Sequence, residues 1–208
     1  MAAGRFVAFE GVEGAGKSTQ VRLLAERLAA AGQAPVVVRE PGGTPLAEEV
    51  RALLLHAAHD IAPTAEALLF QVARADLVAR VIRPALAAGR VVIADRFALS
   101  TLCYQVAGRG LDAARVEAAV ELATGGLVPD IYIVLDVAPA VGRERQQTQG
   151  KGPDRIERAD RAFHDTVARA FRAAAGPNIV HVSADQAPEA VHADVWRALE
   201  GRWQRVPA

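Results

Sequence analysis

The chain has 208 residues, which is enough for one well-buried domain and short for two independent ones. Its 24 basic and 24 acidic residues cancel, so the protein lacks the net positive charge that would hold nucleic acid or an acidic membrane surface. Cys103 is the only cysteine, which excludes an intrachain disulfide and is compatible with a reducing compartment.

The first residues run directly into an apolar segment, without a charged leader. No stretch of the sequence approaches about 18 consecutive apolar residues, the length that a membrane-spanning helix needs. We therefore expect a cytoplasmic protein whose partners are small molecules, with no nucleic-acid or membrane partner.

Five short apolar runs recur along the chain and are separated by segments of helix length. The runs are Phe6–Phe9, Val36–Val38, Val91–Ala94, Ile131–Leu135 and Ile179–Val182. They are rich in Val and Ile and show little alternation, which is typical of parallel strands buried on both faces. The alternation of strands and helices predicts an α/β fold in which helices cover both sides of a five-stranded parallel sheet, in three αβα layers.

Two segments between these runs have their own character. Residues 46–88 form a long helical pattern that is broken near Pro63. Residues 146–155, QQTQGKGPDR, are polar and contain two glycines and a proline, so we predict a mobile loop between helices. No linker divides the chain, and we expect one domain over residues 1–208 with a mobile lid at about residues 143–155.

The segment GVEGAGKS matches the G-x-x-x-x-G-K-[ST] pattern of a phosphate-binding P-loop and lies between a strand and a helix expected over Thr19–Ala30. In such a loop, backbone N–H groups and the helix N-terminus surround the phosphates of ATP. Lys17 would bridge the β and γ oxygens, and the Ser18 hydroxyl would bind Mg²⁺. A glycine-rich turn with an incidental lysine is the alternative. The predicted ATP-binding residues are Gly11, Val12, Glu13, Gly14, Ala15, Gly16, Lys17, Ser18 and Thr19.

A magnesium site in a P-loop NTPase-like fold also needs a carboxylate at the end of a nearby strand. Asp95 and Asp136 each end an apolar run, at the edge where open α/β sheets bind their ligands. Either aspartate could instead cap a helix. We favour Asp95 for the metal, together with Ser18, because Arg96 follows it and would place a cation near a substrate phosphate.

Motifs spread over nearly the whole chain narrow the class of P-loop protein. A guanine-specific switch is excluded because Asn178, the only asparagine, is followed by Ile179 and not by the Lys-x-Asp of a base-reading motif. The ordered motifs FEGVEGAGKST, REPGGTPLAEEVR, LLFQVAR, DRFALSTLCYQVAGRG, PDIYIVLD and DRIE resemble the bacterial thymidylate kinases. That resemblance implies ATP- and Mg²⁺-dependent phosphorylation of dTMP to dTDP by a homodimer.

The resemblance also implies roles for residues around the acceptor nucleotide. Phe70 would stack on thymine and Arg74 would bond its O4 atom, and their spacing puts both on one helix face. The other implied acceptor contacts are Glu10 near the sugar 3′-hydroxyl, Arg39 and Arg96 at the phosphate, Pro41 in the REPGGT loop, Thr101 and Gln105 at the base edge, and Tyr104 against the deoxyribose. An ordinary core position is the alternative for Phe70, and a solvated helix face is the alternative for Thr101 and Gln105.

Transfer to a monophosphate needs no general base, because the acceptor phosphate is already ionised near neutral pH. The enzyme must supply alignment and positive charge. We assign these tasks to Lys17, Arg96 and the metal at Asp95, and we name Arg145 and Lys151 as candidates among the lid cations Arg143, Arg145, Lys151 and Arg155. The chain departs from the family pattern at Ala73, Leu77 and Val106, which puts the fine geometry of the pocket in question.

Three other functions compete with this interpretation. One is a kinase of the same architecture that acts on a deoxynucleoside or another monophosphate. The second is a regulatory module that binds ATP and thymidylate without turnover, and the third is a P-loop assembly ATPase. Retention of Lys17, Ser18, Asp95 and Arg96 argues against the loss of chemistry.

Overall fold

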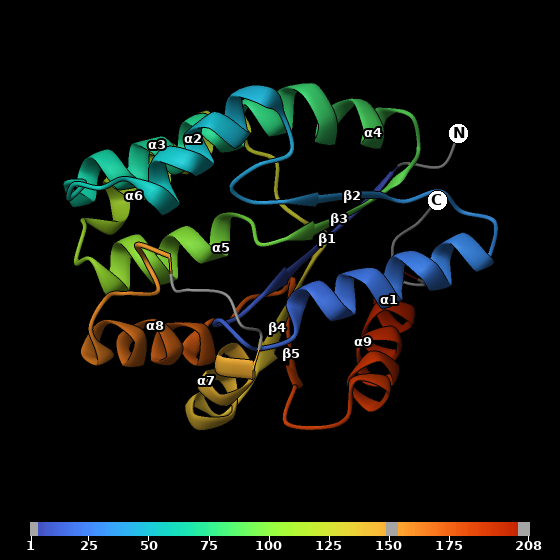
Figure 1. Ribbon diagram of the computed structural model, residues 1–208. Helices are drawn as coiled ribbons and strands as arrows, with labels where there is room; N and C mark the ends of the chain where they lie inside the picture. Colours follow the sequence, from blue (N-terminus) through green and yellow to red (C-terminus); the bar gives the residue numbers. More distant parts are fainter. Residues whose placement is uncertain (1–3, 149–153, 204–208) are drawn as a thin grey trace.

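The computed structural model describes residues 4–148 and 154–203 (Figure 1). Within these ranges five strands form one sheet in the order β2-β3-β1-β4-β5, and every neighbouring pair runs parallel. The strands are β1 (Arg5–Glu10), β2 (Val36–Arg39), β3 (Val91–Asp95), β4 (Ile131–Asp136) and β5 (Ile179–Ser183). The predicted five-stranded parallel sheet is confirmed, and each apolar run lies within one strand.

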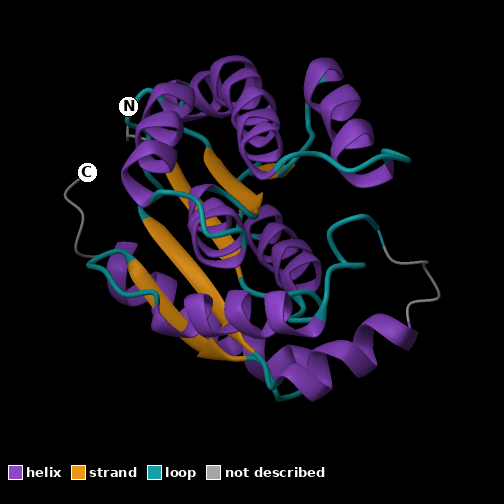
Figure 2. Ribbon diagram, turned by 90° about the vertical axis from the view of Figure 1, so that its left-hand side faces the viewer, coloured by secondary structure: helices purple, strands orange, loops and turns teal. Residues whose placement is uncertain are grey.

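Helices cover both faces of the sheet and give the predicted three layers (Figure 2). They are α1 (Lys17–Ala30), α2 (Pro45–His56), α3 (Pro63–Leu77), η1 (Val78–Ile82), α4 (Arg83–Ala87), α5 (Ala98–Thr101), η2 (Leu102–Gly108), α6 (Ala113–Thr124), α7 (Pro139–Thr148), α8 (Arg161–Ala173) and α9 (Pro188–Trp203). The segments η1 and η2 are π-helical. None of these helices is both long and apolar enough to cross a bilayer.

The central strand β1 shows why its sequence is continuously apolar. Phe6 and Ala8 belong to one buried cluster, together with side chains of α2, α3 and α8. Val7 and Phe9 belong to a second buried cluster, together with side chains of α1 and α9. Successive side chains of a strand point to opposite faces, so a strand covered on both sides must be apolar at every position.

The helical stretch predicted over residues 46–88 is interrupted where the sequence suggests. α2 ends at His56, and α3 begins with Pro63 in its first turn, where the missing N–H needs no partner. Thr44 starts α2, because its side-chain oxygen accepts a hydrogen bond from the Ala47 N–H. α2 and α3 therefore form two separate helices that pack side by side (Figure 1).

The loop predicted over residues 146–155 is wrong at its beginning. α7 continues to Thr148, so residues 146–148 are helical, and Lys151 lies outside the described residues. Where the described chain resumes, the Asp154 carboxylate accepts hydrogen bonds from the N–H groups of Ile156 and Glu157. Glutamine and threonine carry no helix-breaking signal, and the helix therefore extends into a segment whose polarity indicated a loop.

Candidate active site

The P-loop follows β1 directly and ends where α1 begins. Gly11, Gly14 and Gly16 have φ angles of 133°, 73° and 88°, a region that side chains disfavour. Gly14 also contacts α7, because a Cβ atom placed there would lie 2.1 Å from the backbone oxygen of Gly142. These glycines thus permit both the turn of the loop and its close packing against α7.

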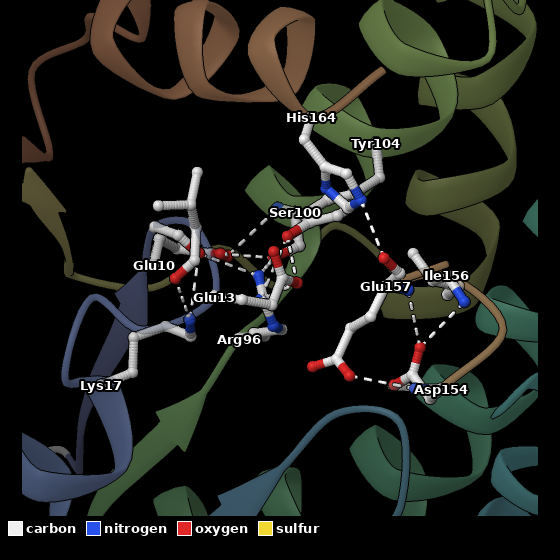
Figure 3. Close-up of polar contacts among 12 residues, drawn as sticks. Glu10, Glu13, Lys17, Arg96, Ser100, Tyr104, Asp154, Ile156, Glu157 and His164 are labelled. Atoms are coloured by element: carbon white, nitrogen blue, oxygen red, sulfur yellow. Dashed lines mark hydrogen bonds and ion pairs between the residues drawn. The ribbon is translucent and has the colours of Figure 1, made fainter. Parts of the chain in front are cut away.

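Lys17 is folded back over the P-loop (Figure 3). Its Nζ atom donates hydrogen bonds to the carbonyl oxygens of Gly11, at 3.0 Å, and Val12, at 2.8 Å. Burial lowers the pKa of Lys17 to about 8, and the neighbouring Arg96 charge acts in the same direction. The ammonium group is therefore held at the loop by weak acceptors that the oxygens of a triphosphate can replace.

Ser18 and Asp95 meet across the carboxyl edge of the sheet. The Ser18 Oγ donates a hydrogen bond of 2.6 Å to the Asp95 carboxylate, although the two residues are 77 positions apart. The other strand-end aspartate, Asp136, instead pairs with the Nδ1 atom of His181 at 2.8 Å. A hydroxyl and a carboxylate at one point fit Mg²⁺, which prefers oxygen ligands and takes few of them from the protein.

Arg96 has a φ angle of 73°, the only positive φ among the described non-glycine residues. Its Nη1 atom donates to the Gly11 carbonyl oxygen and the Ser100 hydroxyl, at 3.0 and 3.1 Å. Its Nη2 atom donates to the Glu13 carboxylate at 2.8 Å and to the Tyr104 hydroxyl at 3.2 Å. A strained backbone held by so many contacts is typical of functional sites, and here it aims a guanidinium at the P-loop.

Glu13 connects the P-loop to the acceptor side of the site (Figure 3). It forms an ion pair with Arg96 and accepts a short hydrogen bond from the Tyr104 hydroxyl. Burial alone would raise the pKa of Glu13, but the charges of Arg96 and Lys17 outweigh it, so the pKa lies below its ordinary value. This ionised carboxylate takes a hydrogen bond from the Nη2 atom of Arg96, the residue that the sequence assigns to the acceptor phosphate.

Glu10 is the last residue of β1, and its carboxylate is fully buried. It accepts hydrogen bonds from the N–H groups of Phe97 and Ser100 and from the Ser100 hydroxyl, at 2.8, 3.2 and 2.6 Å. Burial raises the pKa of Glu10 to about 7, and the bond from Ser100 partly offsets this effect. Glu10 therefore anchors the start of α5, and its contact with a sugar hydroxyl stays a prediction.

Arg74 and Phe70 lie on the same face of α3, one turn apart, but they differ in burial. Phe70 is half-buried at the edge of the core. Arg74 is only 1% exposed, and its guanidinium forms a bidentate ion pair with the buried Glu40, with a closest contact of 2.6 Å. Its remaining hydrogen bonds go to Gln71, Thr101 and the Phe97 carbonyl oxygen. All five N–H donors of Arg74 thus have protein partners.

Thr101 and Gln105 do not form a solvated helix face, because they are 1% and 2% exposed. Thr101 ends α5, and Gln105 lies in the π-helical segment that follows. The Thr101 hydroxyl accepts from Arg74, and the Gln105 amide donates to Glu66 at 3.1 Å. Both side chains are therefore held in place by α3.

The REPGGT segment lies at the carboxyl end of β2, and Arg39 is the last strand residue, not a loop residue as predicted. Arg39 is about half exposed and donates to the Glu48 carboxylate at 3.0 and 3.1 Å. Pro41 is buried after a cis peptide bond, and its carbonyl oxygen accepts from Arg51 at 2.7 Å. Arg51, which the sequence reasoning missed, thus places a second arginine near Arg39.

Two of the lid cations named from the sequence have contacts away from the P-loop. The Arg145 Nη1 atom donates to the Ala184 carbonyl oxygen at 3.0 Å. Arg155 donates through Nε to the Leu54 carbonyl oxygen at 2.8 Å and pairs with Glu66 at 2.6 Å. Arg155 is therefore fixed to the helices of the acceptor side, and Lys151 lies outside the described residues.

Sequence reasoning missed the two buried carboxylates Glu40 and Glu66. Glu40 lies within the motif REPGGTPLAEEVR and Glu66 lies two residues before LLFQVAR. An isolated glutamate carries no sign of the arginine that it will meet in space. For Glu40 the signal is Arg74, which is hard to explain as a core residue without a carboxylate partner; the sequence carries no comparable signal for Glu66, whose partners are Arg109 and Arg155. The departures at Ala73 and Leu77 lie in the apolar core, at 1% and 0% exposure.

Comparisons with known proteins agree with this geometry. The thymidylate kinase family model matches residues 9–195. A thymidylate kinase of Deinococcus radiodurans is 44% identical over 205 residues, covering 97% of this chain and 99% of that protein. A thymidylate kinase of a Synechococcus species is 47% identical and covers 95% of each chain.

A solved structure gives the same result. The crystal structure of thymidylate kinase from Ehrlichia chaffeensis superposes with a TM-score of 0.77 at 30% identity, over 95% of this chain and 99% of that one. The family resemblance inferred from the ordered motifs is confirmed, and so is the fold. The chain belongs to the thymidylate kinase family.

Proposed function

We propose that this kinase transfers the γ-phosphoryl group of ATP to dTMP, forming dTDP, with Mg²⁺ held at Ser18 and Asp95. The observation that carries the proposal is the convergence of Lys17, the Ser18–Asp95 pair and Arg96 at one edge of the sheet. These groups would surround a triphosphate from three sides. Family membership supports the identity of donor and acceptor.

In this mechanism an oxygen of the dTMP phosphate attacks the γ-phosphorus in line, and the bond to the β-phosphate oxygen breaks. No general base is needed, because the attacking oxygen is already ionised. Lys17 stabilises the charge on the transferred oxygens, and Arg96 exchanges Glu13 for the acceptor phosphate. Bound Mg²⁺ would neutralise further charge on the β and γ oxygens.

A panel of nucleoside monophosphates tests this proposal in an ATP-coupled assay with and without EDTA. We expect dTMP to be phosphorylated best. The rate with dUMP should be moderately lower, because the missing methyl group changes binding in an apolar pocket by only about 1 to 3 kcal/mol. Ribonucleotides should react poorly, because the buried Tyr104 leaves little room for a 2′-hydroxyl. EDTA should abolish turnover. Equal rates with all pyrimidine monophosphates would remove the acceptor assignment, and binding without turnover would favour a regulatory module.

We further propose that the enzyme works in the cytoplasm as a homodimer. Helices α2, α3 and α6 adjoin one another (Figure 1). Large apolar side chains are exposed on all three. They are Leu46, Leu53, Leu68, Val72 and Leu122, with exposed fractions of 44%, 52%, 53%, 44% and 86%. An apolar surface of this kind, spread over three neighbouring helices, favours association with a second copy.

Sedimentation tests the dimer directly. The wild-type protein should sediment at twice the 21.9 kDa mass of one chain, whereas Leu68→Glu should sediment as one chain because it buries a charge in the interface. Val128→Glu is the matched control, since Val128 is 60% exposed but lies outside these three helices. A monomeric wild-type protein would contradict the proposal.

A further inference from the structure

Glu66 collects hydrogen-bond donors from two other parts of the chain. It lies in α3 and is only 1% exposed. Gln105 donates to its Oε1 atom at 3.1 Å, and Arg109 donates to both carboxylate oxygens at 3.1 Å. Arg155, at the end of the predicted lid, donates to Oε2 at 2.6 Å. The reaction proposed above assigns no role to Glu66 itself.

The charge of Glu66 determines which way the Gln105 amide faces. Burial alone would raise the pKa of Glu66, but the bonds from Arg109, Arg155 and Gln105 outweigh it and hold the pKa below its ordinary value. An ionised carboxylate can only accept hydrogen bonds, so Gln105 must turn its NH₂ group toward Glu66. Its Oε1 atom then points away from Glu66 and keeps its lone pairs for another donor.

This oriented amide lies beside the residues assigned to the acceptor base. Glu66 precedes Phe70 by one helical turn on α3. Gln105 follows Thr101 by four residues, and the Thr101 hydroxyl is bonded to Arg74. The Gln105 amide is therefore held against α3 through its NH₂ group, four residues along the chain from Thr101, and its oxygen is the part left to accept a hydrogen bond.

We propose that Glu66 is a positioning residue that makes the acceptor site select bases with a ring N3–H group. Thymine and uracil can donate that N3–H to the Gln105 oxygen, whereas the N3 atom of cytosine is an acceptor and would face Oε1 without a proton between them. The inference deepens the proposed function, because it depends on Gln105 contacting the base. Buried polar groups left unpaired give stronger discrimination than apolar contacts do.

The variant Glu66→Gln tests this positioning. A neutral amide at position 66 can donate or accept, so Gln105 becomes free to turn its NH₂ group toward the base. The ratio of kcat/KM for dTMP over dCMP should fall at least about tenfold, mainly through a lower KM for dCMP. The matched control is Arg155→Met, which removes one ion pair of Glu66 but keeps its bond to Gln105, and there the ratio should stay within about twofold.

An unchanged ratio in Glu66→Gln, or an equal fall in Arg155→Met, would overturn the inference. Should Glu66→Gln not fold, hydrogen exchange of the Gln105 side-chain amide in the nucleotide-free wild type replaces that test. The protein is labelled with ¹⁵N-glutamine, and the Gln105 signal is assigned by its loss in Gln105→Met. The Gln105 side-chain amide should be protected, and free exchange would be the contrary result. A wild-type enzyme inactive on dTMP would instead contradict the proposed function, while this exchange measurement still judges the role of Glu66.

Discussion

Lys17→Ala is expected to lower kcat for dTMP phosphorylation by about 10³-fold or more while the protein stays folded. Lys17 is a cation held at the P-loop, and a charge aimed at the transferred phosphoryl oxygens acts most strongly in the transition state. Its removal relieves the cost of burying an ammonium group, so the fold should not suffer. The measurements are an ATP-coupled assay and a thermal melt of the same sample.

The matched control for this change is Arg22→Ala on the same helix. Arg22 is also cationic, but it is 61% exposed and pairs with Glu26. Its loss should leave kcat within about twofold, since exposed ion pairs contribute little. A Lys17→Ala enzyme that retains more than about a tenth of wild-type turnover would rule out the proposed role of the P-loop.

Arg74→Met is expected to destabilise the fold by about 3 to 5 kcal/mol, because it leaves the Glu40 carboxylate buried without its partner. The double variant Glu40→Gln/Arg74→Met should recover much of that loss, since it also removes the buried charge. Urea denaturation measures the free energy of unfolding of each variant. The same single variant should raise the KM for dTMP if Arg74 bonds the base.

Arg80→Met provides the comparison for the buried pair. Arg80 follows Arg74 closely in the chain and pairs with Asp76, but its side chain is 70% exposed. The expected loss is below about 1 kcal/mol, because solvent screens an exposed pair. Similar losses in Arg74→Met and Arg80→Met would show that burial does not govern the strength of the Arg74–Glu40 pair.

The structure also shows which protein contacts the residues assigned to the acceptor site already make. Arg74 and Glu10 were assigned to the nucleotide, and the structure shows that both already have protein partners: all five N–H donors of Arg74 are used, and the Glu10 carboxylate accepts three hydrogen bonds. Arg96 is held by Glu13, so an incoming phosphate competes with a carboxylate already in place. Substrate binding must therefore exchange existing contacts, and a lysine or arginine named from a motif gives no information about those competitors.

The two candidate magnesium carboxylates illustrate a second limit of prediction from the sequence alone. Asp95 and Asp136 both end apolar strands, and no local feature separates them. β3 and β4 flank β1 on opposite sides, and only Asp95 lies next to Ser18, while Asp136 pairs with His181. The choice follows from strand order, which a single sequence does not encode locally.

The sequence by itself determined the parallel sheet, the P-loop and the family. A buried strand is a continuous apolar run and a P-loop is a motif of fixed spacing, so both can be recognised from neighbouring residues alone. Only the tertiary structure decided which charges meet. The pairs Arg74–Glu40 and Arg155–Glu66 join residues 34 and 89 positions apart, across helices whose packing brings them together. Ion pairs depend on distance in space, and so the electrostatics of the acceptor site became visible only with the fold.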